Sequence, residues 1–161
     1  MRVSKFVVFV LTLLMAMSSF ASTSDLGFYS LKFNKVNLRA GPAERFPIKW
    51  VYQEKNYPVE VIDTFEMWRQ IREADGTIGW VHQKMLKPTR YVVIQSEDKL
   101  LDSPTASGQV IAYVQPGVVG RVESCPEGDY CLLQFSHEDR QIEGWFPRRF
   151  VWGLYEGEVV E

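Results

Sequence analysis

The sequence contains few of the residues from which catalytic and metal centres are built. It has two histidines, His82 and His137, and two cysteines among 161 residues. Neither histidine stands at a spacing from Asp, Cys or Ser that is typical of a nucleophilic motif, although a triad of sequence-distant residues stays open. Clustered zinc ligands and a glycine-rich phosphate loop are also missing. We therefore expect a protein that is not an enzyme and that uses no metal and no cofactor.

Positive charge is not in excess either. The chain has 18 Lys and Arg against 20 Asp and Glu, which gives a net charge of −2 at pH 7. A mildly acidic chain lacks the basic surface that attracts nucleic acids and anionic membranes. We expect neither of these as a partner once the N-terminal segment described next has been removed.

One long apolar run occurs, close to the N-terminus. Residues 6–17 (FVVFVLTLLMAM) form a run of 12, which follows Arg2 and Lys5 and precedes Ser19-Phe20-Ala21. This order of charged, apolar and small residues is typical of a secretory signal peptide. The run is shorter than the roughly 20 residues of a spanning helix. We predict a signal peptide over residues 1–21 and an exported protein, periplasmic or extracellular. A buried N-terminal helix is the alternative.

Cys125 and Cys131 flank a stretch of turn-forming residues, PEGDY, between two apolar runs. This pattern predicts a hairpin whose base would fit a bridge, and exported proteins meet oxidising conditions in which disulfides persist. We predict a structural disulfide, for which a loop this short would contribute roughly 2 kcal/mol. Redox-active pairs usually have two residues between their cysteines. Free thiols are the alternative.

Beyond the apolar run, no window longer than ten residues sustains the 3.6-residue period of an amphipathic helix. Short alternating runs are instead separated by Gly, Pro, Asn and Asp, which predicts β-strands. Asp75-Gly76 has the composition of a two-residue hairpin turn. After a short lead-in over residues 22–30, we expect five strands and one helical turn in the first half, over residues 36–39, 48–52, 57–62, 68–72 and 78–81, and then 83–85.

The same series of runs occurs twice. Gly144-Trp145 ends the second series as Gly79-Trp80 ends the first, at a spacing of about 65 residues, which exceeds the roughly 20–50 residues of solenoid repeats. Each glycine is expected where a side chain would meet a neighbouring strand. We predict two small domains that pack closely together, over residues 30–90 and 91–153. A loose acidic tail follows over residues 154–161.

Three segments of the first copy carry a family resemblance: Asn37-Leu38-Arg39-Ala40-Gly41-Pro42, Trp68-Arg69-Gln70-Ile71 and Gly76-Thr77-Ile78-Gly79-Trp80-Val81. In order and spacing they resemble the bacterial SH3-like domain family (SH3b), over roughly residues 35–88 and more loosely over 98–152. The resemblance implies an all-β fold of two tandem SH3-like five-stranded barrels behind a signal peptide. It also implies binding rather than catalysis, with cell-wall peptides or other envelope proteins as targets.

The second copy departs from this pattern at several positions. Lys99 stands for Asn37, Leu101 for Arg39, Ser103 for Gly41 and Tyr130 for Trp68. These changes leave open whether the second copy binds the same ligand or serves as a packing partner for the first.

Aromatic side chains beside cations are the candidate ligand-binding residues. Four aromatics of the first copy are expected to form a groove with an arginine at its rim, which suits extended peptides. For Trp50 and Trp68 a place in the core is the alternative. Two adjacent arginines of the second copy fit a peptide carboxylate, or else form a solvated turn. The predicted residues are Arg39, Arg45, Phe46, Trp50, Tyr52, Trp68, Arg148 and Arg149.

The sequence thus predicts a non-catalytic exported binding module. Its expected ligand is cell-wall peptidoglycan or the peptide stems of peptidoglycan. A module for protein–protein interaction or scaffolding in the envelope is the alternative. The sequence does not determine an oligomeric state.

Overall fold

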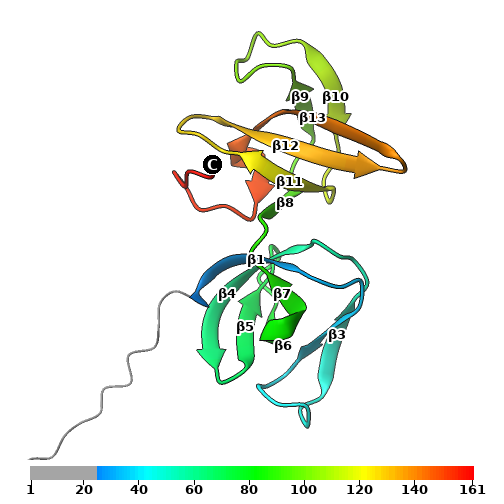
Figure 1. The fold of residues 1–161 in the computed structure, drawn as a ribbon, viewed down its shortest axis with the longest axis vertical. Coiled ribbons are helices and arrows are strands. Elements are labelled where there is room, and N and C mark those ends of the chain that lie inside the picture. Colours follow the sequence, from blue (N-terminus) through cyan, green and yellow to red (C-terminus); the bar gives the residue numbers. More distant parts are fainter. Residues whose placement is uncertain (1–24) are drawn as a thin grey trace, which may run out of the picture.

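A computed structural model describes residues 25–161, so the predicted signal peptide lies outside the described residues. The predicted all-β fold class is confirmed, because two antiparallel sheets account for all of the named strands (Figure 1). No helix in the described part of the chain is long and apolar enough to span a membrane. The first sheet and its 3₁₀ turn comprise β1 (Gly27–Leu31), β2 (Val36–Arg39), β3 (Ile48–Tyr52), β4 (Pro58–Phe65), β5 (Trp68–Arg72), β6 (Ile78–His82), η2 (Gln83–Met85) and β7 (Leu86–Lys87).

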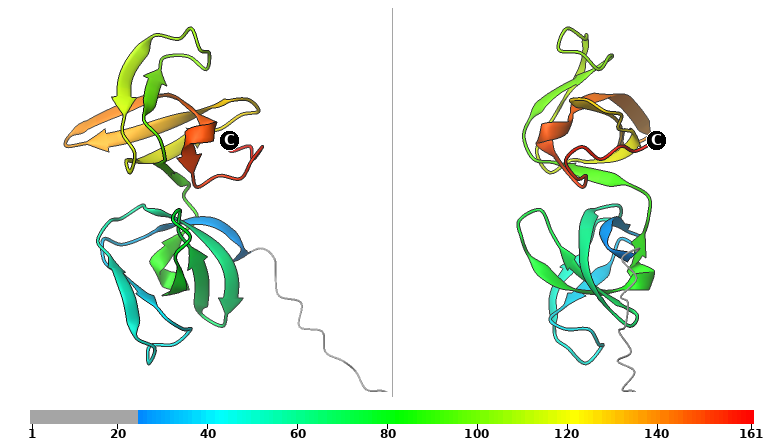
Figure 2. Two further views of the ribbon diagram at one scale, coloured as in Figure 1. Left: turned by 180° about the vertical axis from the view of Figure 1, so that it is seen from behind. Right: turned by 90° about the vertical axis from the view of Figure 1, so that its left-hand side faces the viewer.

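The second sheet repeats this succession of elements. It comprises β8 (Tyr91–Ile94), β9 (Asp98–Leu101), β10 (Val110–Val114), β11 (Val119–Ser124), β12 (Tyr130–His137), β13 (Arg140–Pro147), η3 (Arg148–Phe150) and β14 (Val151–Trp152). The strand orders are β3-β2-β6-β5-β4-β1-β7 and β10-β9-β13-β12-β11-β8-β14, which are the same order shifted by seven. Each sheet bends around its own core, and the two barrels lie end to end (Figures 1 and 2).

The five strands expected in the first half correspond to β2–β6, and the sheet contains two more. One is the two-residue β7, and the other is β1, which falls largely in the segment expected as a lead-in. β1 buries Phe28, Ser30 and Leu31. The sequence pattern gave a weak signal here because Ser30 is polar. Its hydroxyl is satisfied inside the protein, where it donates a 2.8 Å hydrogen bond to the carbonyl of Thr89.

The core of the first barrel is almost entirely aliphatic. Alternation along β2 buries Val36 and Leu38 and turns Asn37 and Arg39 to the other face. Tyr52 is the one aromatic side chain in the buried cluster of this barrel, so neither Trp50 nor Trp68 belongs to that cluster. The buried cluster consists of Leu31, Val36, Leu38, Tyr52, Val59, Val61, Ile71 and Val81.

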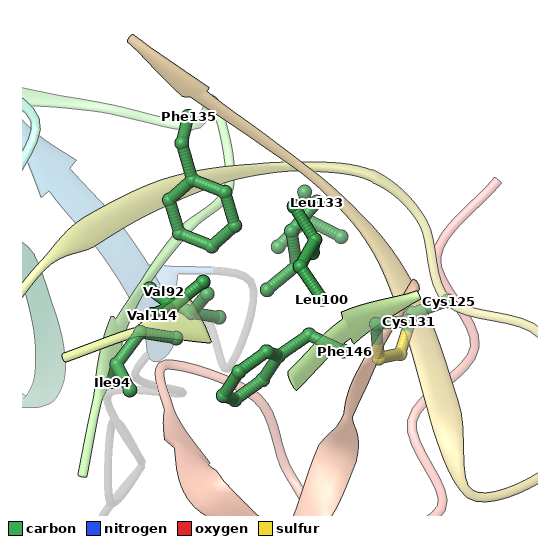
Figure 3. Packing of buried hydrophobic residues seen from close by; sticks show 10 residues of the cluster. Val92, Ile94, Leu100, Val114, Cys125, Cys131, Leu133, Phe135 and Phe146 are labelled. Atoms are coloured by element: carbon green, nitrogen blue, oxygen red, sulfur yellow. A yellow bond between two sulfur atoms is a disulfide. The ribbon is translucent and has the colours of Figure 1, made fainter. Parts of the chain in front are cut away.

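The second barrel has a core of its own, in which Phe135 and Phe146 pack with leucine and valine side chains (Figure 3). The predicted disulfide between Cys125 and Cys131 is confirmed, and it lies at the edge of this cluster. Cys125 also forms a two-hydrogen-bond bridge with Val160. The disulfide therefore connects β12 to the C-terminal segment as well as closing its own loop.

Gly79 and Gly144 occupy equivalent places in the two sheets, next to a buried leucine. A Cβ built on Gly79 would lie 2.5 Å from Leu38 Cγ, and one on Gly144 would lie 2.7 Å from Leu100 Cγ. Real Cβ atoms do not approach other carbons so closely. The steric reason predicted for the glycine of each Gly-Trp pair is therefore confirmed.

The acidic tail is not loose, contrary to expectation. Besides the bridge at Val160, Glu158 is held from two sides: its carboxylate accepts a 2.8 Å hydrogen bond from Arg90, and its carbonyl accepts a 2.6 Å hydrogen bond from Arg148. Tyr155 donates from its hydroxyl to Glu60 across the two barrels, at 3.0 Å. The composition of the tail does not indicate these contacts, because Arg90 and Glu60 lie far from it in the sequence.

The two barrels are in contact, in line with the prediction that they pack closely together. The ring of Phe28 packs against Trp152 and Tyr155, with ring centroids 5.0 and 4.9 Å apart. The Arg90 guanidinium lies 5.6 Å from the centroid of the same ring. Phe28 is thus enclosed by side chains from β14, the C-terminal tail and the connection between the barrels, although it belongs to the first sheet.

Candidate binding grooves

The β2–β3 hairpin separates the predicted site residues onto two faces. Val36 and Leu38 pair with Tyr52 and Trp50, and directly paired residues of an antiparallel ladder share a face. Trp50 and Tyr52 therefore lie on the core side of the hairpin, whereas Arg39 lies on the outer side. The structure does not gather the four predicted aromatics into one groove. It forms two grooves with different charge.

The first, which we call the Trp68 groove, has a volume of about 450 Å³ and lies on the outer side of β2. It brings together two of the predicted residues, Arg39 and Trp68, with residues from β6 and η2. Its lining residues are Lys35, Asn37, Arg39, Glu44, Trp68, His82, Lys84 and Met85.

Arg39 fixes one wall of the Trp68 groove by holding the β2–β3 loop. Its Nη1 donates 2.9 Å hydrogen bonds to the carbonyls of Glu44 and Phe46. The Phe46 ring lies over Gly41, where a Cβ would approach ring carbons to 2.7 Å, and the Arg45 guanidinium lies 5.2 Å from the ring centroid. Phe46 and Arg45 therefore order the loop and do not line the groove.

Trp68 and His82 form the flat side of the groove. They are direct cross-strand partners on β5 and β6, and their rings meet edge to face with centroids 5.5 Å apart. His82 Nδ1 accepts a 3.1 Å hydrogen bond from the backbone N–H of Lys84, which caps η2. A neutral imidazole whose Nδ1 accepts carries its proton on Nε2, so His82 offers one further donor. His82 was not among the residues predicted to bind a ligand, because its pairing with Trp68 depends on the strand register.

Charge in the Trp68 groove is predominantly positive. The groove is lined by three cationic side chains, Lys35, Arg39 and Lys84, and by one carboxylate, that of Glu44. Lys35 and Lys84 are exposed, so their interactions with an anion are those of rim charges, which influence specificity and association rate more than affinity. A flat aromatic side with cations at the rim suits a ligand that has an apolar part and a carboxylate.

The second groove, the Trp50 groove, has the opposite charge. It has a volume of about 640 Å³, and no Lys, Arg or His is among the described residues that line it: Trp50, Val51, Tyr52, Gln53, Glu54, Tyr57 and Glu73. Trp50 is 61% exposed, and the Tyr52 hydroxyl donates a 2.6 Å hydrogen bond to Glu73 Oε1. Burial is the main reason that the pKa of Glu73 is raised, and burial likewise raises the pKa of Tyr57 to about 12.

A cleft of about 800 Å³ lies between η3 and the tail of the second barrel. The two arginines predicted to bind a carboxylate border it, but they engage different partners. Arg148 Nη2 donates to the carbonyls of Glu158 and Pro126 at 2.6 and 3.2 Å, so Arg148 anchors the tail. The Arg149 side chain is 68% exposed and lies over the Phe150 ring at 4.4 Å. Among residues 25–161, no group of three or more His, Cys, Asp and Glu is placed to hold a metal ion.

The second barrel does not reproduce either groove of the first. By register, Tyr130 and Pro147 occupy the places of Trp68 and His82. Ala112 pairs with Leu100 as Trp50 pairs with Leu38. The two barrels therefore share a strand order but present different surfaces.

Comparison with known proteins finds a family match for the first barrel. Residues 32–88 match the family model described as the bacterial SH3 domain. The solved structures of NlpC1 and NlpC2 from Trichomonas vaginalis are similar to this chain at 15% and 13% identity, each with a TM-score of 0.35. They cover 89% and 84% of the chain, which spans about half (50%) of each. No curated protein matches the sequence. The first barrel, over residues 32–88, is thus similar to the bacterial SH3 domain.

Proposed function

We propose that this chain is a non-catalytic binding protein of the cell envelope, and that its first barrel binds the peptide stems of cell-wall peptidoglycan in the Trp68 groove. The observation that carries the proposal is the composition of this groove within a bacterial SH3 domain. It combines the paired rings of Trp68 and His82 with a cationic rim.

Peptide stems offer the chemistry that this groove is built to accept. An extended peptide presents apolar side chains to an aromatic surface and ends in a carboxylate, for which Lys35 and Lys84 are available. Arg39 orders the loop through Nη1, so the groove wall is formed before the ligand arrives. A preformed site reduces the ordering cost of binding.

We further propose that the second barrel is a copy of the same module with a supporting role. It has the same strand order, and its tail contacts the first barrel through Tyr155. The disulfide and the N-terminal apolar run support export to the periplasm or the cell exterior.

Co-sedimentation with purified peptidoglycan sacculi tests the proposal. The wild-type protein should pellet with the sacculi. Trp68→Ala should weaken binding by about tenfold or more, which corresponds to about 1.4 kcal/mol. A double charge reversal of the exposed residues, Lys35→Glu with Lys84→Glu, should slow association and weaken binding less than Trp68→Ala does, without disturbing the core.

Tyr130→Ala in the second barrel is the matched control, because Tyr130 has the register position of Trp68. It should pellet like the wild type. Circular dichroism verifies that each variant is folded. Wild-type protein that stays in the supernatant, or a Trp68→Ala variant that pellets as well as the control, would refute the proposal.

One observation favours a second candidate function, a protein partner that adds a strand. β10 is an edge strand of the second sheet, and it exposes Val110, Ile111 and Tyr113 at 45%, 46% and 62%. An exposed apolar edge strand is a template for pairing with another chain. Crosslinking that captures an envelope protein through β10, together with no binding to sacculi, would favour this function over the first.

A further inference from the structure

The Trp50 groove contains a carboxylate that is held in position and that forms no ion pair with any of residues 25–161. Glu73 follows β5, and its backbone N–H donates a 2.9 Å hydrogen bond to the carbonyl of Thr77 at the base of the β5–β6 hairpin. The Tyr52 hydroxyl donates to Oε1 at 2.6 Å. Tyr52 itself is buried, so both the carboxylate and its donor are anchored in the barrel.

No ion pair of the described residues involves Glu73, although it is partly shielded from solvent. Burial raises its pKa, the hydrogen bond from Tyr52 acts in the opposite direction, and the nearby carboxylate of Asp75 raises the pKa further. Glu54 adds a second negative charge on the groove wall. A cation that entered here would meet a carboxylate that forms no ion pair with another described residue, and a nearby cation favours the charged form of that carboxylate.

Aromatic rings supply the rest of the groove surface. The rings of Tyr52 and Tyr57 are stacked with centroids 6.2 Å apart, and Trp50 exposes most of its indole. The face of an aromatic ring attracts a cation within about 6 Å of its centroid, and Trp does so most strongly. Aromatic faces beside carboxylates favour organic cations over metal ions, because the rings also contact the alkyl chain of an organic cation.

The second barrel shows that the fold does not require this combination. At the register positions of Trp50 and Tyr52 it has Ala112 and Val114. Leu133 pairs with Gly144 in the second barrel as Ile71 pairs with Gly79 in the first, so these two residues are equivalent. Two residues further along each strand direction, the second barrel has Phe135 where the first has Glu73. All three replacements are apolar, and Phe135 is buried in the core. The same topology is thus stable without the carboxylate.

We propose that the Trp50 groove binds the alkylammonium group of an amine-bearing ligand, with Glu73 accepting hydrogen bonds from the ammonium and Trp50 and Tyr57 packing on its alkyl part. The site lies on the opposite face of the β2–β3 hairpin from the Trp68 groove and takes a ligand of opposite charge. It therefore does not depend on the function proposed for that groove.

The test uses n-butylammonium as the probe and n-butanol as its neutral isostere. Titration into ¹⁵N-labelled protein is followed by NMR. Butylammonium should shift the Trp50 indole signal and the backbone signals of residues 50–57 and 73 along a saturable curve, and butanol should not. Glu73→Gln and Trp50→Ala should each weaken binding about fivefold, the effect of about 1 kcal/mol.

Glu143→Gln is the matched control, because Glu143 is an exposed carboxylate in the second barrel. It should bind butylammonium like the wild type. Equal chemical-shift changes with butanol and butylammonium, or an unchanged affinity of the Glu73→Gln variant for butylammonium, would overturn the proposal. The comparison of the two probes on the wild-type protein decides the question even if a variant does not fold. Sacculus binding reports separately on the Trp68 groove, because the probe carries no carboxylate.

Discussion

Replacing Gly79 by alanine is expected to destabilise the protein by about 1–3 kcal/mol, although the change adds a single methyl group. The new Cβ would lie 2.5 Å from Leu38 Cγ, 2.7 Å from Leu38 Cδ1 and 3.0 Å from the Arg39 carbonyl oxygen. Carbon atoms in contact are normally about 3.5–4.0 Å apart, so Leu38 would have to move by about 1 Å. Leu38 is 0% exposed and belongs to the buried cluster, so its movement would displace other core side chains.

A double-mutant cycle in urea isolates this clash. Leu38→Ala alone should cost about 2–5 kcal/mol through lost burial and a cavity. In the double variant, the methyl group added by Gly79→Ala would enter the space that Leu38 leaves, so the two costs should fall short of additivity by at least about 1 kcal/mol. Gly144→Ala, which meets Leu100 in the second barrel, should repeat the single-variant result. A Gly79→Ala midpoint equal to that of the wild type, or strict additivity, would refute the steric reasoning.

Three further outcomes are expected. Burial raises the pKa of Tyr52 above its ordinary value, as does the hydrogen bond that its hydroxyl donates. The unfolded chain then loses the Tyr52 hydroxyl proton at lower pH than the folded protein does, so the stability of the fold decreases as the pH rises above about 10. Tyr52→Phe should make the melting temperature decline less over that pH range. A decline equal to that of the wild type would contradict this assignment. Tyr155→Phe removes the hydrogen bond to Glu60 and should loosen the contact between the barrels. NMR relaxation should then show more independent tumbling of the two barrels. Unchanged tumbling would show that the packing of the rings is enough to hold the barrels together. Replacing both Cys125 and Cys131 by serine should lower the unfolding free energy by roughly 2 kcal/mol, measured in urea, and an unaltered midpoint would count against the chain-entropy account.

Local patterns in the sequence predicted most of the strands of the first barrel. Alternation over 36–39 and 68–72 predicted strands that the structure contains as β2 and β5. Asp75-Gly76 predicted the hairpin turn, where Gly76 has φ of +87° and the Asp75 carboxylate accepts from the Thr77 N–H. These features depend on neighbours within a few residues, so a linear sequence records them directly.

The candidate sites depended on contacts that a linear sequence does not record. Arg39 and Trp68 were predicted for one groove together with Trp50, yet the hairpin places Trp50 on its other face. His82 joins Trp68 because β5 and β6 pair in one register. A register shift of one residue would exchange the faces, and only the closed barrel fixes it.

By itself, the sequence determined the all-β class, the position of the disulfide and the need for glycine before each tryptophan of the Gly-Trp pairs. Each of these follows from short-range pattern or from the size of one side chain. Only the tertiary structure decided that two grooves of opposite charge flank one hairpin, and that the acidic tail is anchored by Arg90 and Arg148. Charges and rings from separate strands acquire a common environment only when the sheet closes, and the tail finds its partners only on the folded surface.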